Sequence, residues 1–146
     1  LRAVCDMEKL GERQVTVDCD VLQADGGTRV ASICGGLLAL HDALSRLQAR
    51  KQINEHPINE ACAAVSVGII NGEARLDLPY EEDSKADTDM NVVMTESGEF
   101  IEIQGTAEKF SFSKNELTTL LALAEKGINE IIALQKELLR TPPQRR

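Results

Sequence analysis

Apolar residues recur at two different spacings in the first third of the chain. From Arg13 to Gln23 apolar and polar residues nearly alternate, which predicts a strand with one face toward the core. From about Thr28 to Arg50 the apolar residues follow helical spacing, which predicts a long amphipathic helix. Gly35-Gly36 lowers the helix propensity there and therefore suggests close packing against a sheet. Leu1 to Leu10 is typical of the end of a helix without an N-cap, and Gly11 supplies its stop.

The middle of the chain predicts two β-hairpins. Cys62 to Ile70 is a small, largely apolar run, which is typical of a strand. Asn71-Gly72 follows at once, and both residues tolerate the positive φ of a type I′ turn, so Glu73 to Leu78 is expected to return antiparallel. After an acidic, irregular segment, Met90 to Thr95 and Glu99 to Gln104 predict a second hairpin.

The last predicted element is a helix that begins with a capping box. Ser113 is followed three residues later by Glu116, and apolar residues then continue at helical spacing. Gly127 is expected to weaken or split this helix. We therefore predict one α+β domain over residues 1–140, with a mostly antiparallel sheet and helices packed on one face. Residues 141–146 are predicted to form a disordered basic tail.

The composition is that of an acidic, soluble protein. The 146 residues are 42% hydrophobic and carry 16 basic and 24 acidic side chains, a formal net charge of −8. No apolar run approaches the roughly 20 residues that a membrane span needs, so we expect no membrane contact and a cytoplasmic location. An acidic chain lacks the positive surface of a nonspecific nucleic-acid coater, although it can still bind one phosphate locally. The four cysteines form no C-x-x-C pair and are expected to be reduced core thiols.

A glycine turn joins the first predicted strand to the long helix. Asp25-Gly26-Gly27-Thr28-Arg29 offers backbone N–H groups at a helix N-terminus, a hydroxyl and a planar guanidinium, all of which suit phosphate oxygens. The same residues also fit an ordinary tight turn with an exposed arginine, because they match neither G-x-x-x-x-G-K-[ST] nor G-x-G-x-x-G. The local pattern alone leaves both interpretations open.

Acidic residues gather between the two predicted hairpins, at Glu81, Glu82, Asp83, Asp87 and Asp89. Carboxylates that converge there would hold Mg²⁺, or one of them would act as a general acid. A solvated charged loop is the alternative interpretation. The neighbouring phosphate-type turn favours the functional interpretation, because a phosphate site, a cation and carboxylates together are what phosphoryl transfer requires.

Five strings of residues follow one another in an order and spacing that carry a resemblance: Asp18–Arg29, Ala64–Ile69, Glu82–Ser84, Asp87–Thr95 and Gln104–Glu108. The most specific are the runs from Gln23 to Arg29 and from Met90 to Thr95. With these strings the chain resembles the ribonuclease PH family, from Leu1 to about Gln135. Related phosphorolytic subunits share the general fold and the acidic positions, but these two runs point to ribonuclease PH.

The resemblance implies a ribonuclease PH-like fold and a phosphate-dependent 3′-to-5′ exoribonuclease activity. Such an enzyme trims the 3′ ends of transfer RNA precursors, with ribosomal RNA processing as a related task, and releases nucleoside diphosphates. On the family pattern, Gly27, Thr28 and Arg29 match the phosphate-binding turn. Asp83 and Asp89 match the paired aspartates that bind the divalent metal, Mg²⁺, or assist protonation of the leaving group.

The resemblance also implies partners. They are inorganic phosphate as co-substrate, RNA, and further copies of the chain in a ring hexamer built as a trimer of dimers. The family's N-terminal portion, with a second phosphate-contacting arginine and basic segments that engage RNA, has no counterpart in this sequence. The alternative interpretation is therefore a truncated, catalytically inactive structural or assembly remnant of this fold.

Overall fold

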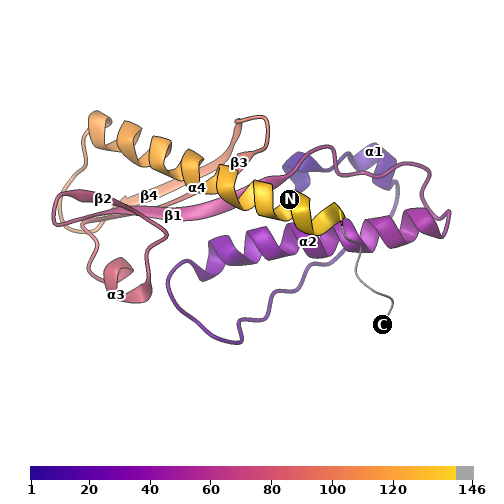
Figure 1. Cartoon of the computed structure of the whole chain (residues 1–146), viewed down its shortest axis with the longest axis horizontal. Helices are drawn as coiled ribbons and strands as arrows, with labels where there is room; N and C mark the ends of the chain where they lie inside the picture. The colour runs from indigo at the N-terminus through magenta and orange to yellow at the C-terminus, as the bar shows by residue number, and fades with distance from the viewer. Residues whose placement is uncertain (141–146) are drawn as a thin grey trace.

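The computed structural model describes residues 1–140, which form a four-stranded sheet with two long helices (Figure 1). In chain order the elements are η1 (Arg2–Val4), α1 (Met7–Leu10), α2 (Thr28–Ala49), β1 (Cys62–Ile70), β2 (Glu73–Leu76), α3 (Tyr80–Asp83), β3 (Thr88–Thr95), β4 (Phe100–Ala107) and α4 (Lys114–Arg140). The strands lie in the order β2-β1-β3-β4, and all neighbours are antiparallel. The predicted α+β class with an antiparallel sheet is confirmed. The tail predicted at 141–146 lies outside the described residues, and the single domain over 1–140 stays a prediction.

Strand β1 is an inner strand of the sheet and has the bounds that the sequence predicts. All its residues except the last are buried. One of its faces packs against α4, which lies along the sheet in Figure 1. The apolar cluster between them contains Val65, Val67, Leu120, Ala124, Ile128 and Ile132. A strand covered on both faces is a continuous apolar run rather than an alternating one, and the sequence of β1 has this form.

The first turn of α2 reaches the other face of the sheet, so the prediction that the helices pack on one face is wrong. Val30 packs against Ala64 and Val93. The side chains of these two strand residues point away from α4, because successive side chains of a strand alternate between the faces. Farther along, α2 leaves the sheet (Figure 1) and packs through Leu44 against Leu10. The start of α2 is therefore held against β1 and β3, whereas its end packs against the N-terminal residues and does not contact the sheet.

Helix α2 is also the one helix within residues 1–140 whose length and apolar composition would suit a membrane span. Two of its leucines, Leu37 and Leu44, are fully buried inside the protein. In this fold these two leucines therefore belong to the core.

Turn and cap signals in the sequence are confirmed. Asn71 and Gly72 have φ values of 52° and 79°, as the predicted type I′ turn requires. At the start of α4 the Glu116 N–H donates to Ser113 Oγ at 3.2 Å, and the Ser113 N–H donates to Glu116 Oε2 at 2.6 Å. These two bonds are the predicted capping box.

The strand predicted from Arg13 to Gln23 is wrong. These residues are exposed, and those from Arg13 to Val21 have no regular structure. A strand is held by hydrogen bonds to a neighbouring strand, and none within residues 1–140 pairs with this segment. Its apolar residues Val15 and Val17 instead line a groove of about 340 Å³ beside Leu44.

The predicted split of the last helix at Gly127 and the predicted packing of Gly35-Gly36 against a sheet are also wrong. Helix α4 is unbroken from Lys114 to Arg140, and Gly127 lies where a Cβ would come within 2.9 Å of Leu76 Cδ1. The glycine therefore permits close packing of α4 on β2. Gly36 approaches Val17 rather than a sheet, and the space around Gly35 is open.

The N-terminal residues form two short turns rather than the end of one helix. Asp6 Oδ1 accepts the N–H groups of Glu8 and Lys9 at 3.0 and 3.2 Å, and this cap begins α1. The expected absence of an N-cap is therefore wrong. The predicted stop is confirmed, since Gly11 caps α1 with φ 69°.

The core-thiol prediction holds for only some of the cysteines. Cys62 is buried, Cys5 and Cys34 are half-buried, and Cys19 is exposed. Cys19 lies in the segment that has no strand partner, and its side chain remains exposed although its thiol donates to the Ser32 carbonyl oxygen of α2 at 3.8 Å. The prediction for Cys19 is therefore wrong.

Candidate functional site

The glycine turn forms the N-terminus of α2. Gly27 is the N-cap residue, with φ 69° and ψ 28°, a left-handed conformation that favours glycine. No side chain caps this end, and the first turn contains no acidic residue. The first N–H groups of a helix have no acceptor within the helix, and they carry the positive end of its dipole. The turn is therefore well suited to an anion.

Asp25 fastens this turn to the start of α3. Its Oδ1 atom accepts the N–H of Gly26 at 2.8 Å and the N–H of Tyr80 at 2.7 Å. These bonds favour the charged carboxylate, so they lower the pKa of Asp25, with the bond from Tyr80 the larger cause. The turn before α2 and the acidic segment after β2 are thereby held side by side.

The two segments approach so closely that only glycine fits at position 26. A Cβ on Gly26 would lie 1.9 Å from the carbonyl oxygen of Leu78. We expect Gly26→Ala to lower the free energy of unfolding by at least about 2 kcal/mol, because the backbone contact cannot relax locally. Gly35→Ala is the matched control, since its Cβ meets open space, and it should raise the stability by up to about 1 kcal/mol. Thermal unfolding followed by circular dichroism tests both changes, and equal stability of the two variants would contradict the close approach.

Ser66 of β1 contacts both the residues that follow β2 and the glycine turn before α2. Its Oγ accepts the N–H of Leu78 at 3.1 Å, and its carbonyl oxygen accepts the N–H of Asp77 at 2.8 Å. A Cβ on Gly27 would lie 3.5 Å from the same hydroxyl. Ser66 is therefore a buried hydroxyl that fixes the end of the β2 hairpin beneath the glycine turn.

Asp89 lies on the face of the sheet that carries the glycine turn. Asp89 pairs with Gly68 across β1 and β3, two positions along from the pair of Ser66 and Asn91. Residues two positions apart on a strand share a face and are about 7 Å apart. The structure therefore brings Gly27 and Asp89 to neighbouring positions on one surface.

Asp83 is close enough to influence Asp89. Asp83 is the last residue of α3, a single helical turn within the segment that the sequence predicted to be irregular. Burial raises the pKa of Asp89 above its ordinary value, and the negative charges of Asp83 and Glu108 raise it further. A carboxyl group with a raised pKa beside a second carboxylate suits either proton transfer or a divalent cation.

Arg29 is directed away from these carboxylates. Its Nη1 and Nη2 atoms donate to Oε1 and Oε2 of Glu102 at 2.7 and 2.8 Å. Glu102 is the cross-strand partner of Val93, which is four positions along β3 from Asp89, or about 13 Å. The sequence therefore identified Arg29 but missed the carboxylate that holds it. The alternation of Ile101, Glu102 and Ile103 is the one signal that could have placed Glu102 on this face.

The residues that follow β4 bond to the acidic segment. The Glu108 N–H donates to the Asp87 carbonyl oxygen at 2.9 Å. Lys109 Nζ donates to Asp87 Oδ1 at 3.2 Å and to the Lys85 carbonyl oxygen at 2.7 Å. Lys109 neutralises one carboxylate near Asp89, and the sequence gave no local signal for it.

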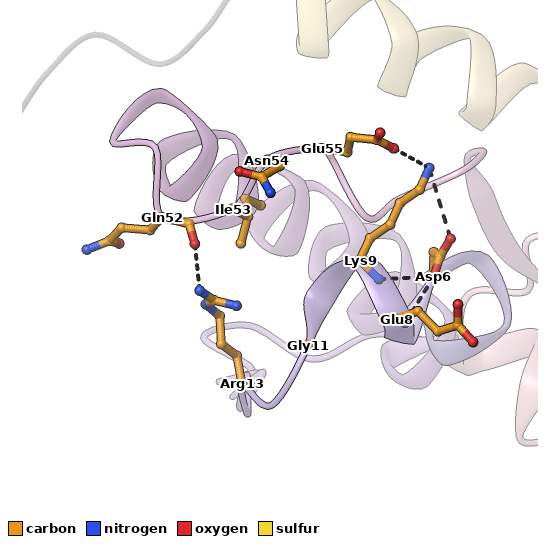
Figure 2. A pocket seen from close by; sticks show the side chains of 9 residues that line it. All are labelled: Asp6, Glu8, Lys9, Gly11, Arg13, Gln52, Ile53, Asn54 and Glu55. Atoms are coloured by element: carbon orange, nitrogen blue, oxygen red, sulfur yellow. Dashed lines mark hydrogen bonds and ion pairs between the residues drawn. The ribbon is translucent and has the colours of Figure 1, made fainter.

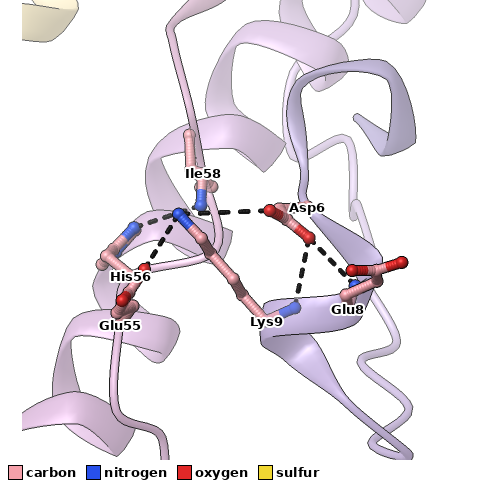
Figure 3. Close-up of polar contacts among 6 residues, drawn as sticks. All are labelled: Asp6, Glu8, Lys9, Glu55, His56 and Ile58. Atoms are coloured by element: carbon pink, nitrogen blue, oxygen red, sulfur yellow. Dashed lines mark hydrogen bonds and ion pairs between the residues drawn. The ribbon is translucent and has the colours of Figure 1, made fainter.

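A further cavity lies away from the glycine turn and the acidic segment. It has a volume of about 550 Å³ and lies between α1 and the segment after α2 (Figure 2). Its lining residues are Asp6, Glu8, Lys9, Gly11, Arg13, Gln52, Ile53, Asn54 and Glu55. Figure 3 shows that Lys9 links the two sides through Glu55 and Asp6. Charges of both signs already pair within this cavity, and none of the predicted site residues lines it.

No group of three or more His, Cys, Asp or Glu side chains within residues 1–140 is arranged to hold a metal ion. Asp83 and Asp89 remain the pair with suitable chemistry, because Mg²⁺ is commonly held by one or two carboxylates together with water and substrate phosphates. An anion-type helix end, an arginine and two carboxylates are the parts that phosphoryl transfer uses.

Comparison with known families agrees with this fold. Residues 1–45 match the profile of the 3′ exoribonuclease family, domain 1, and residues 61–127 match domain 2 of the same family. The chain belongs to the 3′ exoribonuclease family.

Two similar proteins are named ribonuclease PH. The chain is 59% identical to that of Neisseria meningitidis serogroup C over 139 residues, which are 95% of this chain and 57% of the relative. It is 56% identical to that of Corynebacterium kroppenstedtii over 146 residues, which are 100% of this chain and 58% of the relative. The chain therefore spans less than two thirds of the length of these relatives.

A solved structure supports the fold. The chain resembles rice (Oryza sativa) Rrp46 with a TM-score of 0.64 and 15% identity, over 82% of this chain and 51% of that chain. At this identity the likeness shows the ribonuclease PH-like fold alone, which the sequence predicted.

Proposed function

We propose that the protein acts as a phosphate-dependent 3′-to-5′ exoribonuclease. In this reaction an oxygen of inorganic phosphate attacks the phosphorus of the last phosphodiester of RNA. The bond from that phosphorus to the 3′ oxygen of the preceding nucleotide breaks, and a nucleoside diphosphate leaves. The shortened RNA takes up a proton and ends in a 3′ hydroxyl. The proposal rests chiefly on the shared surface of Gly27 and Asp89, together with the identity to proteins named ribonuclease PH.

In this proposal Gly27, Thr28 and Arg29 bind inorganic phosphate. The N-terminus of α2 offers N–H donors without a side-chain cap, and Arg29 offers a charged fork. These donors would hold the attacking phosphate and reduce the repulsion between it and the RNA phosphate.

Asp83 and Asp89 complete the proposed reaction. Their carboxylates would hold Mg²⁺, which when bound supplies positive charge to phosphate oxygens. The raised pKa of Asp89 also suits it to deliver a proton to the departing 3′ oxygen. The retention of both aspartates with Arg29 favours an enzyme over an inactive remnant.

Further parts of the proposal rest on the family resemblance. They are the trimming of transfer RNA precursors, the processing of ribosomal RNA, a ring hexamer built as a trimer of dimers, and a cytoplasmic location without membrane contact. The exposed side chains of Phe100 and Ile103 on the edge strand β4 are consistent with contacts between copies.

The test is an assay of released nucleotides. The protein is incubated with a short 3′-extended RNA and Mg²⁺, with or without inorganic phosphate, and the products are resolved by chromatography. We expect nucleoside diphosphates only when phosphate is present. Monophosphates in both reactions would indicate hydrolysis and contradict the proposal, and the absence of any release would favour the inactive remnant.

A further inference from the structure

The guanidinium of Arg29 is held by a carboxylate of its own chain. Two parallel bonds of 2.7 and 2.8 Å join both terminal nitrogens to both oxygens of Glu102. This bidentate geometry is the one in which a guanidinium also binds phosphate. Glu102 therefore occupies the donors that the proposed phosphate site would use.

The packing of α2 explains why these two residues meet. Val30 packs against Val93 on the face of the sheet opposite α4, and Glu102 is the cross-strand partner of Val93. Arg29 precedes Val30 in the first turn of α2, so its side chain reaches the neighbouring position on β4. The ion pair thus follows from the docking of the helix and is not an accidental surface contact.

The pair is open to exchange with a bound anion. The Arg29 side chain is 50% exposed and the Glu102 side chain 37% exposed, so water screens their attraction. The first turn of α2 contains no carboxylate of its own, and Glu102 of β4 is the acidic side chain that pairs with Arg29. An anion with more negative charge than the Glu102 carboxylate would be attracted more strongly at the helix N-terminus, both by the helix dipole and by the guanidinium of Arg29.

We propose that Glu102 is a built-in competitor of phosphate for Arg29 and thereby sets the affinity of the turn for phosphate. This inference rests on the proposed function, in which Arg29 binds inorganic phosphate. When phosphate binds, the guanidinium exchanges its carboxylate partner for phosphate oxygens. The exchange lowers the affinity for phosphate by the free energy needed to break the bonds between Arg29 and Glu102.

The test is calorimetric titration of the purified protein with inorganic phosphate. We expect Glu102→Gln to lower the dissociation constant by about three- to tenfold, because the amide competes weakly for the guanidinium. Glu55→Gln is the matched control, since it removes the same charge from an exposed carboxylate whose partner is Lys9 Nζ at 3.0 Å (Figure 3) and not Arg29. This control should leave the dissociation constant unchanged.

A double-mutant cycle separates this inference from the proposed function. In an Arg29→Ala background, Glu102→Gln should have no more effect than Glu55→Gln. If Arg29→Ala weakens phosphate binding while Glu102→Gln leaves it unchanged or weaker, the competitor role is overturned and the phosphate role of Arg29 stands. If Arg29→Ala binds phosphate as tightly as the wild type does, both the competitor role of Glu102 and the phosphate role of Arg29 are overturned. The same holds if neither the wild type nor any variant binds phosphate.

Discussion

Replacing Arg29 with alanine is expected to weaken the use of inorganic phosphate by about 30- to 150-fold. A charge-assisted, bidentate contact in a partly desolvated site contributes about 2 to 3 kcal/mol, which corresponds to this range. The measurement is the phosphate concentration that half-saturates the release of nucleoside diphosphates, or the dissociation constant for phosphate itself. The fold should persist, because exposed ion pairs such as that of Arg29 with Glu102 contribute at most about 1 kcal/mol.

Arg46→Ala provides the control for this variant. Arg46 is exposed in the last turn of the same helix, at the end that does not meet the sheet. Arg46→Ala removes the same charge from α2 as Arg29→Ala does, but it should leave the half-saturating phosphate concentration unchanged. Equal saturation in Arg29→Ala and the wild type would show that the glycine turn is an ordinary turn with an exposed arginine.

Replacing Asp89 with asparagine is expected to lower turnover and raise stability together. Turnover should fall by at least about 100-fold, because the variant can neither hold a cation as a carboxylate nor deliver a proton. The melting temperature at pH 7 should rise by about 1 to 3 °C, because the change removes a charge that burial, Asp83 and Glu108 all disfavour. RNA binding should change little. Loss of the fold in this variant would instead assign Asp89 to structure.

The stability gained by Asp89→Asn should depend on pH. The folded protein raises the pKa of Asp89 above its ordinary value of 3.8, so the fold favours the protonated carboxyl. Above the raised pKa the wild type carries the disfavoured charge, and the advantage of asparagine is complete. As the pH falls from the raised pKa toward 3.8 the wild type becomes protonated, and the advantage should disappear. Melting curves over this acidic range measure the convergence.

Glu81→Gln is the matched control for Asp89→Asn. Glu81 is an exposed residue of α3 in the same acidic segment, and no hydrogen bond or ion pair within residues 1–140 involves its side chain. This change also removes one negative charge near the site. It should therefore alter neither the turnover nor the acid dependence of stability. A similar loss of turnover in both variants would indicate that the segment acts through its total charge and that Asp89 has no special role.

Elements with a local signal were predicted well from the sequence. The bounds of β1, the turn at Asn71-Gly72 and the capping box at Ser113 all agree with the structure. Each of these depends on the spacing of neighbouring side chains or on backbone angles that few residues adopt. The family resemblance supplied the site residues for the same reason, since its strings are runs of adjacent residues.

The failures share a different cause. The alternation from Arg13 to Gln23 is correct for a strand, but a strand also needs a partner, and residues 1–140 provide none. Gly127 appeared unfavourable within a helix, yet its missing side chain admits Leu76. In both cases contacts with distant residues outweighed the local propensity. The segment from Arg13 to Gln23 has no strand to pair with, and Gly127 packs against Leu76.

The sequence by itself determined the family and the order of the two long helices and the four strands of the sheet, and it nominated residues for the candidate site. Only the tertiary structure decided how those residues are held. Asp25 bonds to Tyr80 across 55 positions, and Arg29 bonds to Glu102 across 73 positions. Such partners come together because α2 docks on β1 and β3, and the docking depends on packing between distant segments. Local periodicity encodes the elements, whereas the partner of a charged side chain is fixed only when the elements pack.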